Sequence, residues 1–148
     1  MSIDGWRHKD VWTTNRVSGD DFVIEVVRFT SKAYLPNEGE NKWCMYVYVY
    51  PQHPLFKKIN PTVGDTISTY DDRLPNMPLH GGCTYTRIHL TEDCKEITSI
   101  QIGADYSHYR DERYSFMATK EDAYEVFFDA EQLYKWMQEY SGDEPETD

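Results

Sequence analysis

The sequence predicts an α+β fold, namely an antiparallel sheet of about four to six strands with one long C-terminal helix packed on a face. Segments rich in β-branched and aromatic residues recur through the first two thirds of the chain, and the one long segment with helical periodicity comes last. That order favours α+β over alternating strands and helices. The length of 148 residues suits a single domain. We assign it to residues 1–140 and expect 141–148 to form a flexible acidic tail.

The first strand predicted by the sequence spans residues 21–29, where β-branched residues dominate. Residues 1–20 before it are polar and contain Trp6 and Trp12. We expect them to form an irregular arm that holds its indole rings on the body of the domain. Residues 30–42 after the strand contain Pro, Gly and Asn, which is typical of a loop.

Residues 43–50 give the clearest strand signal, because two kinds of side chain alternate along them. One face would carry Trp43, Met45, Val47 and Val49, and the other Cys44, Tyr46, Tyr48 and Tyr50. The tyrosine side has two interpretations. It is either a row of rings that stacks a base, or a half-buried face under the C-terminal helix.

The middle of the chain predicts two more strands, at residues 82–90 and 96–103, joined by a short link. A short helical turn is expected over residues 52–60. Residues 60–79 hold several prolines and read as a long loop, and loops of this length in compact domains are often functional.

The C-terminal helix is predicted from about Lys120 to Tyr140, with Thr119 as its N-cap. Apolar residues recur there at steps of three and four, which places them on one face of a helix. These residues are Ala123, Val126, Phe127, Ala130, Leu133, Tyr134, Met137 and Tyr140.

The charge balance restricts the partners. Fifteen Lys and Arg against 26 Asp and Glu give a net charge of −11, which argues against a long nucleic acid or an anionic membrane surface. A small nucleotide remains compatible, because a few local donors hold one phosphate. The charge also suits simple solubility or an acidic mimic of DNA. The three cysteines have no framework spacing, and we expect free thiols in a reducing cytoplasm.

Three of the five histidines, His53, His80 and His108, lie next to predicted strand ends. Side chains at strand ends often meet in a cleft. The three histidines therefore either share one site or have separate structural or surface roles. Gly81 and Gly82 follow His80, where they would expose backbone N–H groups to a ligand or simply form a turn.

Asp105, His108 and Asp111 follow each other at three-residue steps. A carboxylate beside an imidazole serves general acid/base catalysis, and the same set suits a divalent metal. The alternative is a charged surface loop. Along the strand at 82–90, Tyr85 and Arg87 share a polar face with His89, and the guanidinium of Arg87 suits a phosphate.

Three motifs occur in order: Tyr48-Val-Tyr-Pro-Gln-His-Pro-Leu-Phe56, Leu79-His-Gly-Gly-Cys-Thr-Tyr85, and Ile102-Gly-Ala-Asp-Tyr-Ser-His108 with Asp111. Together they resemble a widespread family of small phage and prophage proteins. That family has Pro-x-His-Pro-Leu-Tyr, His-Gly-Gly-Leu-Thr-Tyr and Gly-x-Asp-x-x-His-x-x-Asp segments. The resemblance covers about residues 43–140, with Phe56 replacing Tyr and Cys83 replacing Leu. The motif residues carried over are His53, His80, Thr84, Tyr85, Asp105, His108 and Asp111.

The resemblance implies a viral origin and the cytoplasm of an infected bacterium. By analogy it implies a counter-defence protein that acts on nucleotide immune signals, as in the CBASS and Thoeris pathways.

The first hypothesis is a phosphodiesterase of cyclic nucleotides. His80 and His108 would be acid and base, Asp105 would orient His108, and His53 would be a third polar group. Phosphate would be held by Arg87 or by the N–H groups of Gly81 and Gly82.

The second hypothesis is a sponge that binds a nucleotide signal without chemistry. Its ligand-binding residues would be Tyr46, Tyr48, Thr84, Tyr85, Arg87, Gly81 and Gly82. A third hypothesis is an acidic inhibitor that mimics DNA. The sequence leaves the cofactor open, with Asp105, His108 and Asp111 as ligands if a divalent metal binds, and it also leaves a homo-oligomer open.

Overall fold

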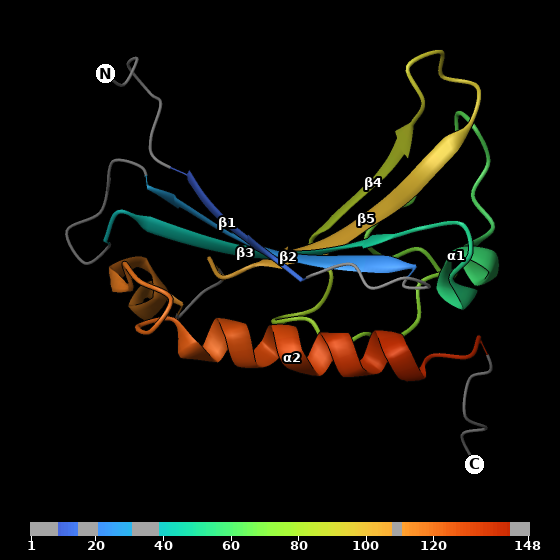
Figure 1. Ribbon diagram of the computed structural model, residues 1–148. Coiled ribbons are helices and arrows are strands. Elements are labelled where there is room, and N and C mark those ends of the chain that lie inside the picture. Colours follow the sequence, from blue (N-terminus) through green and yellow to red (C-terminus); the bar gives the residue numbers. More distant parts are fainter. Residues whose placement is uncertain (1–8, 15–20, 31–38, 108–110, 143–148) are drawn as a thin grey trace.

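The computed structural model describes residues 9–14, 21–30, 39–107 and 111–142, and it confirms the α+β arrangement (Figure 1). Five antiparallel strands form one sheet in the order β1-β2-β3-β5-β4, and a C-terminal helix crosses one face. The strands are β1 (Lys9–Thr13), β2 (Phe22–Thr30), β3 (Asn41–Val49), β4 (Tyr85–Leu90) and β5 (Ile97–Asp105). The helices are α1 (Pro54–Ile59), the 3₁₀ turn η1 (Glu112–Phe116) and α2 (Tyr124–Glu139).

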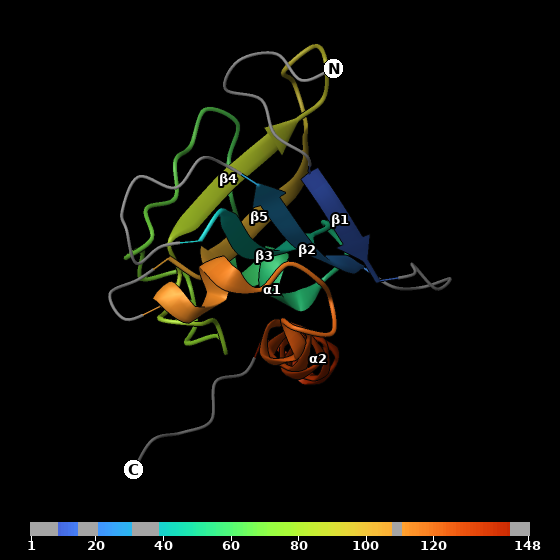
Figure 2. The same cartoon turned by 90° about the vertical axis from the view of Figure 1, so that its left-hand side faces the viewer.

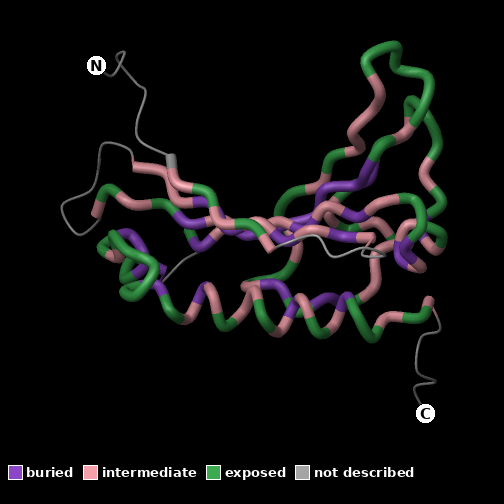
Figure 3. Tube along the Cα trace, viewed as in Figure 1, coloured by how far each residue is buried: buried purple, intermediate pink, exposed green. Residues whose placement is uncertain are grey.

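The long helix α2 packs against β2 and β3 and buries the apolar side of the sheet (Figures 2 and 3). Phe127 meets the Trp43 ring edge-on at a centroid distance of 6.0 Å, and Tyr134 meets Phe22 at 5.2 Å. The Trp/Met/Val side of β3 is fully buried there. The tyrosine side of β3 faces away from α2, so the interpretation that it lies under the C-terminal helix is wrong. The helix covers the more apolar face because that face gains more from burial.

Residues 9–13 form the edge strand β1, so the irregular arm predicted for residues 1–20 is wrong over this stretch. Pairing with β2 provides backbone partners for a segment that contains Val, Trp and Thr, which favour strands. Trp12 stacks on Trp43 with ring centroids 5.5 Å apart, as expected for a ring held on the domain body. Trp6 lies outside the described residues.

The helix α2 begins at Tyr124, later than predicted. Thr119 caps the turn before it, because its side-chain oxygen accepts the Asp122 N–H at 3.1 Å and its carbonyl accepts the Ala123 N–H at 3.1 Å. At the other end, residues 143–148 of the predicted tail lie outside the described part. Among the described helices, none is long and apolar enough to cross a membrane.

The sheet bends strongly, so that β4 and β5 rise away from α2 (Figure 1). The face turned away from α2 therefore lies on the inner side of this bend. The short helix α1 lies near the C-terminal end of α2, and the irregular segment 60–84 connects α1 to β4. This bend determines which side chains share the uncovered face.

Candidate functional site

The uncovered face of the sheet brings together most of the residues predicted to bind a ligand. The strand register places Tyr46 of β3 opposite Gly103 of β5, and Gly103 opposite Tyr85 of β4. The Tyr46 and Tyr85 rings meet across this glycine at 5.4 Å, with 69° between their planes. The result is a pair of rings that come from strands far apart in sequence.

A second row runs parallel to the first. Here Tyr48 lies opposite Gln101, and Gln101 lies opposite Arg87. The His89 ring lies 5.7 Å from that of Tyr48, and its Nε2–H donates to Gln101 Oε1 at 2.7 Å. We call the surface formed by Tyr46, Tyr48, Tyr85, Arg87, His89, Gln101 and Gly103 the tyrosine face.

Gly103 determines how close the rings lie to the sheet. A Cβ at this position would meet the Tyr46 ring at 2.3 Å and the backbone oxygen of Met45 at 2.4 Å. Contacts this short do not occur for real Cβ atoms, so the ring occupies the space that a side chain would fill. Gly103 and Gln101 were not among the predicted site residues. The only sequence signal for them is their even spacing with Asp105 on the same strand.

The hydroxyls of Tyr46 and Tyr48 remain protonated, because burial is the main influence that raises the pKa of each. Glu25 of β2 adds to the rise in the Tyr48 pKa, whereas Arg87 opposes it. The Arg87 side chain is exposed, and no hydrogen bond or ion pair joins its guanidinium to another described residue. The face therefore offers neutral donors, aromatic rings and one available guanidinium.

The two glycines after His80 form a turn. Gly81 and Gly82 both have positive φ, at 68° and 88°, and both are exposed. The Gly82 N–H donates to Leu79 O at 3.0 Å, so that group is already used within the turn. Thr84 ties the start of β4 to β5, since its hydroxyl accepts the Asp105 N–H at 3.2 Å.

His80 lies in a separate cluster on the helix side of the sheet. Its Nε2 is 2.8 Å from Asp111 Oδ2, and because an ionised carboxylate only accepts, Nε2 carries the proton. The His80 ring stacks on Tyr106 at 4.3 Å and meets Tyr114 edge-on at 5.5 Å. Asp111 is buried, with 9% of its surface exposed. A half-exposed histidine is therefore held between a carboxylate and two rings.

Acidic groups of α2 surround this cluster. The Tyr106 hydroxyl donates to Asp129 at 2.7 Å, and burial followed by this bond raises the pKa of Tyr106. Burial and then a hydrogen bond to Glu125 raise the pKa of Tyr114 to about 12. The guanidinium of Arg113 binds Glu125 at 2.8 Å and lowers the pKa of that carboxyl. The Arg113 guanidinium offsets the charge of Glu125, but the carboxylates of Asp111 and Asp129 still disfavour an anionic phosphodiester beside His80.

Asp105, the predicted partner of His108, lies on the uncovered face and accepts the Ser107 N–H at 3.1 Å. His108 lies outside the described residues, so its predicted pairing with Asp105 and the metal set of Asp105, His108 and Asp111 stay predictions. Among the residues that the structure describes, no group of three His, Cys, Asp or Glu is arranged to hold a metal ion.

The structure shows His53 in a structural position. Its side chain is 2% exposed, its Nδ1 accepts the Leu55 N–H at 2.9 Å, and its Nε2–H donates to Met137 O at 2.8 Å. It therefore caps α1 and joins it to the end of α2. Met137 is eight residues beyond Asp129, which contacts the His80 cluster, and this is about 12 Å along the helix. The structure therefore does not bring His53 and His80 together in one site.

Neither a family model, a curated protein nor a solved structure matches this chain. The resemblance to phage proteins consequently rests on the three sequence motifs. The observations that bear on function are the tyrosine face, with its free guanidinium, and the pair formed by His80 and Asp111.

Proposed function

We propose that this protein binds a small nucleotide on its tyrosine face and sequesters it without chemistry. The observation that carries the proposal is the meeting of Tyr46 and Tyr85 over Gly103, beside the row that contains Arg87. Aromatic rings on an uncovered sheet face are a common platform for bases, because every base has a flat face that stacks. The guanidinium of Arg87 supplies a planar pair of donors for a phosphate.

The net charge of −11 limits the ligand to a small one. A long strand would place many phosphates against an acidic surface, whereas a mono- or dinucleotide needs one local cation. The resemblance to phage proteins makes a cyclic nucleotide immune signal the first ligand class to test. In that setting the protein would act in the cytoplasm of the infected bacterium.

The test is calorimetric titration of the purified protein with a panel of cyclic dinucleotides. Stacking on one aromatic ring contributes about 1–3 kcal/mol per base, so Tyr85→Ala should weaken binding about 5- to 150-fold. Tyr70→Ala is the matched control, because Tyr70 is 92% exposed and lies outside the tyrosine face. Arg87→Gln should also weaken binding, whereas Lys95→Gln, the same charge change in the β4–β5 link, should not.

Ligand released by heating the complex should be chemically unchanged. Failure of every member of the panel to bind would overturn the proposal. Equal losses in Tyr85→Ala and Tyr70→Ala would overturn the assignment to the tyrosine face.

A second candidate function is a phosphodiesterase, and the pair formed by His80 and Asp111 favours it. A carboxylate 2.8 Å from the ring holds one tautomer and stabilises the protonated imidazole, which suits acid/base catalysis. We place it second because Glu125 and Asp129 lie beside the same cluster. Incubation with the same panel, followed by chromatography, should then give a hydrolysed product that His80→Asn abolishes. Intact ligand throughout would eliminate this candidate.

A further inference from the structure

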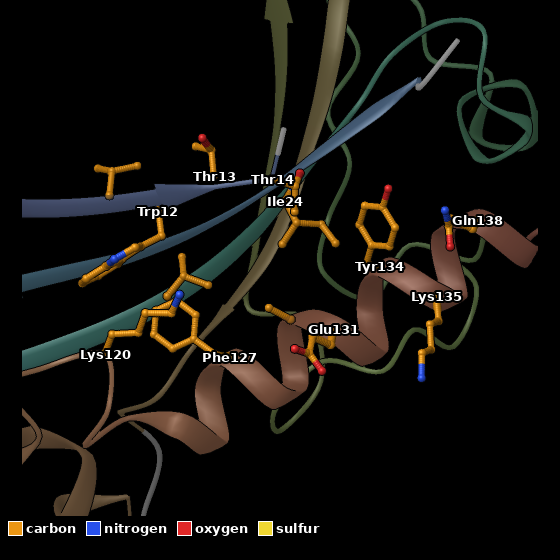
Figure 4. Close-up of a pocket in the computed structure, with 13 residues that line it drawn as sticks. Trp12, Thr13, Thr14, Ile24, Lys120, Phe127, Glu131, Tyr134, Lys135 and Gln138 are labelled. Carbon is orange, nitrogen blue, oxygen red and sulfur yellow. The ribbon is translucent and has the colours of Figure 1, made fainter. Parts of the chain in front are cut away.

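A groove of about 760 Å³ lies between β1, β2 and α2, on the opposite side of the sheet from the tyrosine face (Figure 4). Its volume falls within the range of pockets that hold small molecules. Trp12 is central to one wall, because it stacks on Trp43 at 5.5 Å and meets Phe127 edge-on at 5.3 Å. The groove is thus built on rings that are packed in place.

The lining is mainly apolar. On the strand side it includes Ile24 and Val26, and on the helix side Phe127, Ala130 and Tyr134. Ala130 lies three residues after Phe127 and four before Tyr134, so these three side chains share one side of α2. The small side chain at position 130 leaves space between two aromatic residues.

One cation reaches into this apolar space. The Lys120 ammonium lies 5.1 Å from the centroid of the Phe127 ring, and Figure 4 shows its side chain extending toward the rings of Phe127 and Trp12. No ion pair joins Lys120 to a carboxylate in the described part of the chain. The other lysine at the groove, Lys135, points away from the strands (Figure 4).

We propose that this groove binds a small hydrophobic carboxylate. The apolar body would lie along Trp12, Phe127 and Ala130, and the carboxylate would pair with Lys120. Charge complementarity selects the ligand class. The charged residues that line the groove are Lys120, Lys135 and Glu131, so their net charge is +1. The ammonium over the apolar rings is that of Lys120, which matches one negative charge on an apolar body. This site goes beyond the proposed nucleotide function and does not depend on it.

The experiment is calorimetric titration of the full chain with decanoate, decanol and decyltrimethylammonium, all below their aggregation concentrations. Decanoate should bind saturably and more tightly than the other two probes. Lys120→Gln should weaken decanoate binding about 1.5- to fivefold, as expected for one exposed ion pair, and leave decanol binding unchanged. Lys135→Gln is the matched control, because it removes the same charge from a side chain that points away from the strands, and it should leave decanoate affinity unchanged.

Ala130→Phe should abolish decanoate binding by filling the groove, and a cooperative thermal transition would show that the variant is folded. Arg87→Gln should bind decanoate normally, which separates this site from the tyrosine face. Absence of saturable decanoate binding would overturn the proposal. Equal affinities for decanoate and decyltrimethylammonium, or full binding by folded Ala130→Phe, would overturn it as well.

Discussion

Replacement of His53 by Ala should destabilise the fold and leave ligand binding intact. The variant loses the cap on the Leu55 N–H, which is worth about 1 kcal/mol. It also loses the hydrogen bond to Met137 O, worth about 0.5–1.5 kcal/mol. The edge-on contact with Phe22 at 5.6 Å is lost too, and a small cavity remains. Together these changes predict a loss of about 2–4 kcal/mol, or roughly 5–15 °C in the melting temperature.

Urea denaturation followed by circular dichroism measures the loss directly. His53→Asn separates the two hydrogen bonds, because an Asn side chain at an N-cap still accepts the Leu55 N–H but is too short to reach Met137. It should recover about 1 kcal/mol of the loss. The structural interpretation fails if His53→Ala keeps its stability within about 0.5 kcal/mol while it loses nucleotide binding or cleavage.

Two further predictions concern Gly103 and Arg73. Gly103→Ala places a Cβ against the Tyr46 ring and a backbone oxygen, so urea denaturation should show a loss of about 1–3 kcal/mol, and unchanged stability would contradict the close packing. The Arg73 guanidinium binds Asp71 and holds the pKa of that carboxyl at about 2, below its ordinary 3.8. Because the folded-state pKa is the lower one, the stabilisation is complete above pH ~4 and is lost as pH falls through about 2. Melting temperatures of wild type and Arg73→Gln should therefore converge near pH 2, whereas a constant gap would argue against this pair.

The alternation along β3 was enough to predict which residues share each face of the sheet. It was not enough to show which face the helix covers, because both faces carry aromatic rings. The chemical difference decides this, since the Trp/Met/Val side is fully apolar and the tyrosine side carries hydroxyls. The strand β1 was missed because its residues stand in a polar segment and only pairing with β2 makes them a strand.

The grouping of Tyr85 and Arg87 followed from their spacing, and strand pairing then adds Tyr46 and Tyr48 from a distant segment. The separation of His53 from His80 was beyond sequence reasoning. His53 is held by Met137, 84 residues away, and no local pattern contains that contact. The groove beside β1 was missed for the same reason, because residues 11–14 and 120–138 line it together.

Binding of a small nucleotide on the tyrosine face can be located residue by residue in solution. The most direct test is to record the amide chemical shifts of the isotope-labelled protein during titration with a cyclic dinucleotide that binds it. The largest changes should fall on Tyr46, Gln101 and Arg87 and their neighbours across β3, β5 and β4. Changes confined to the groove around Trp12, or to the cluster around His80, would contradict it.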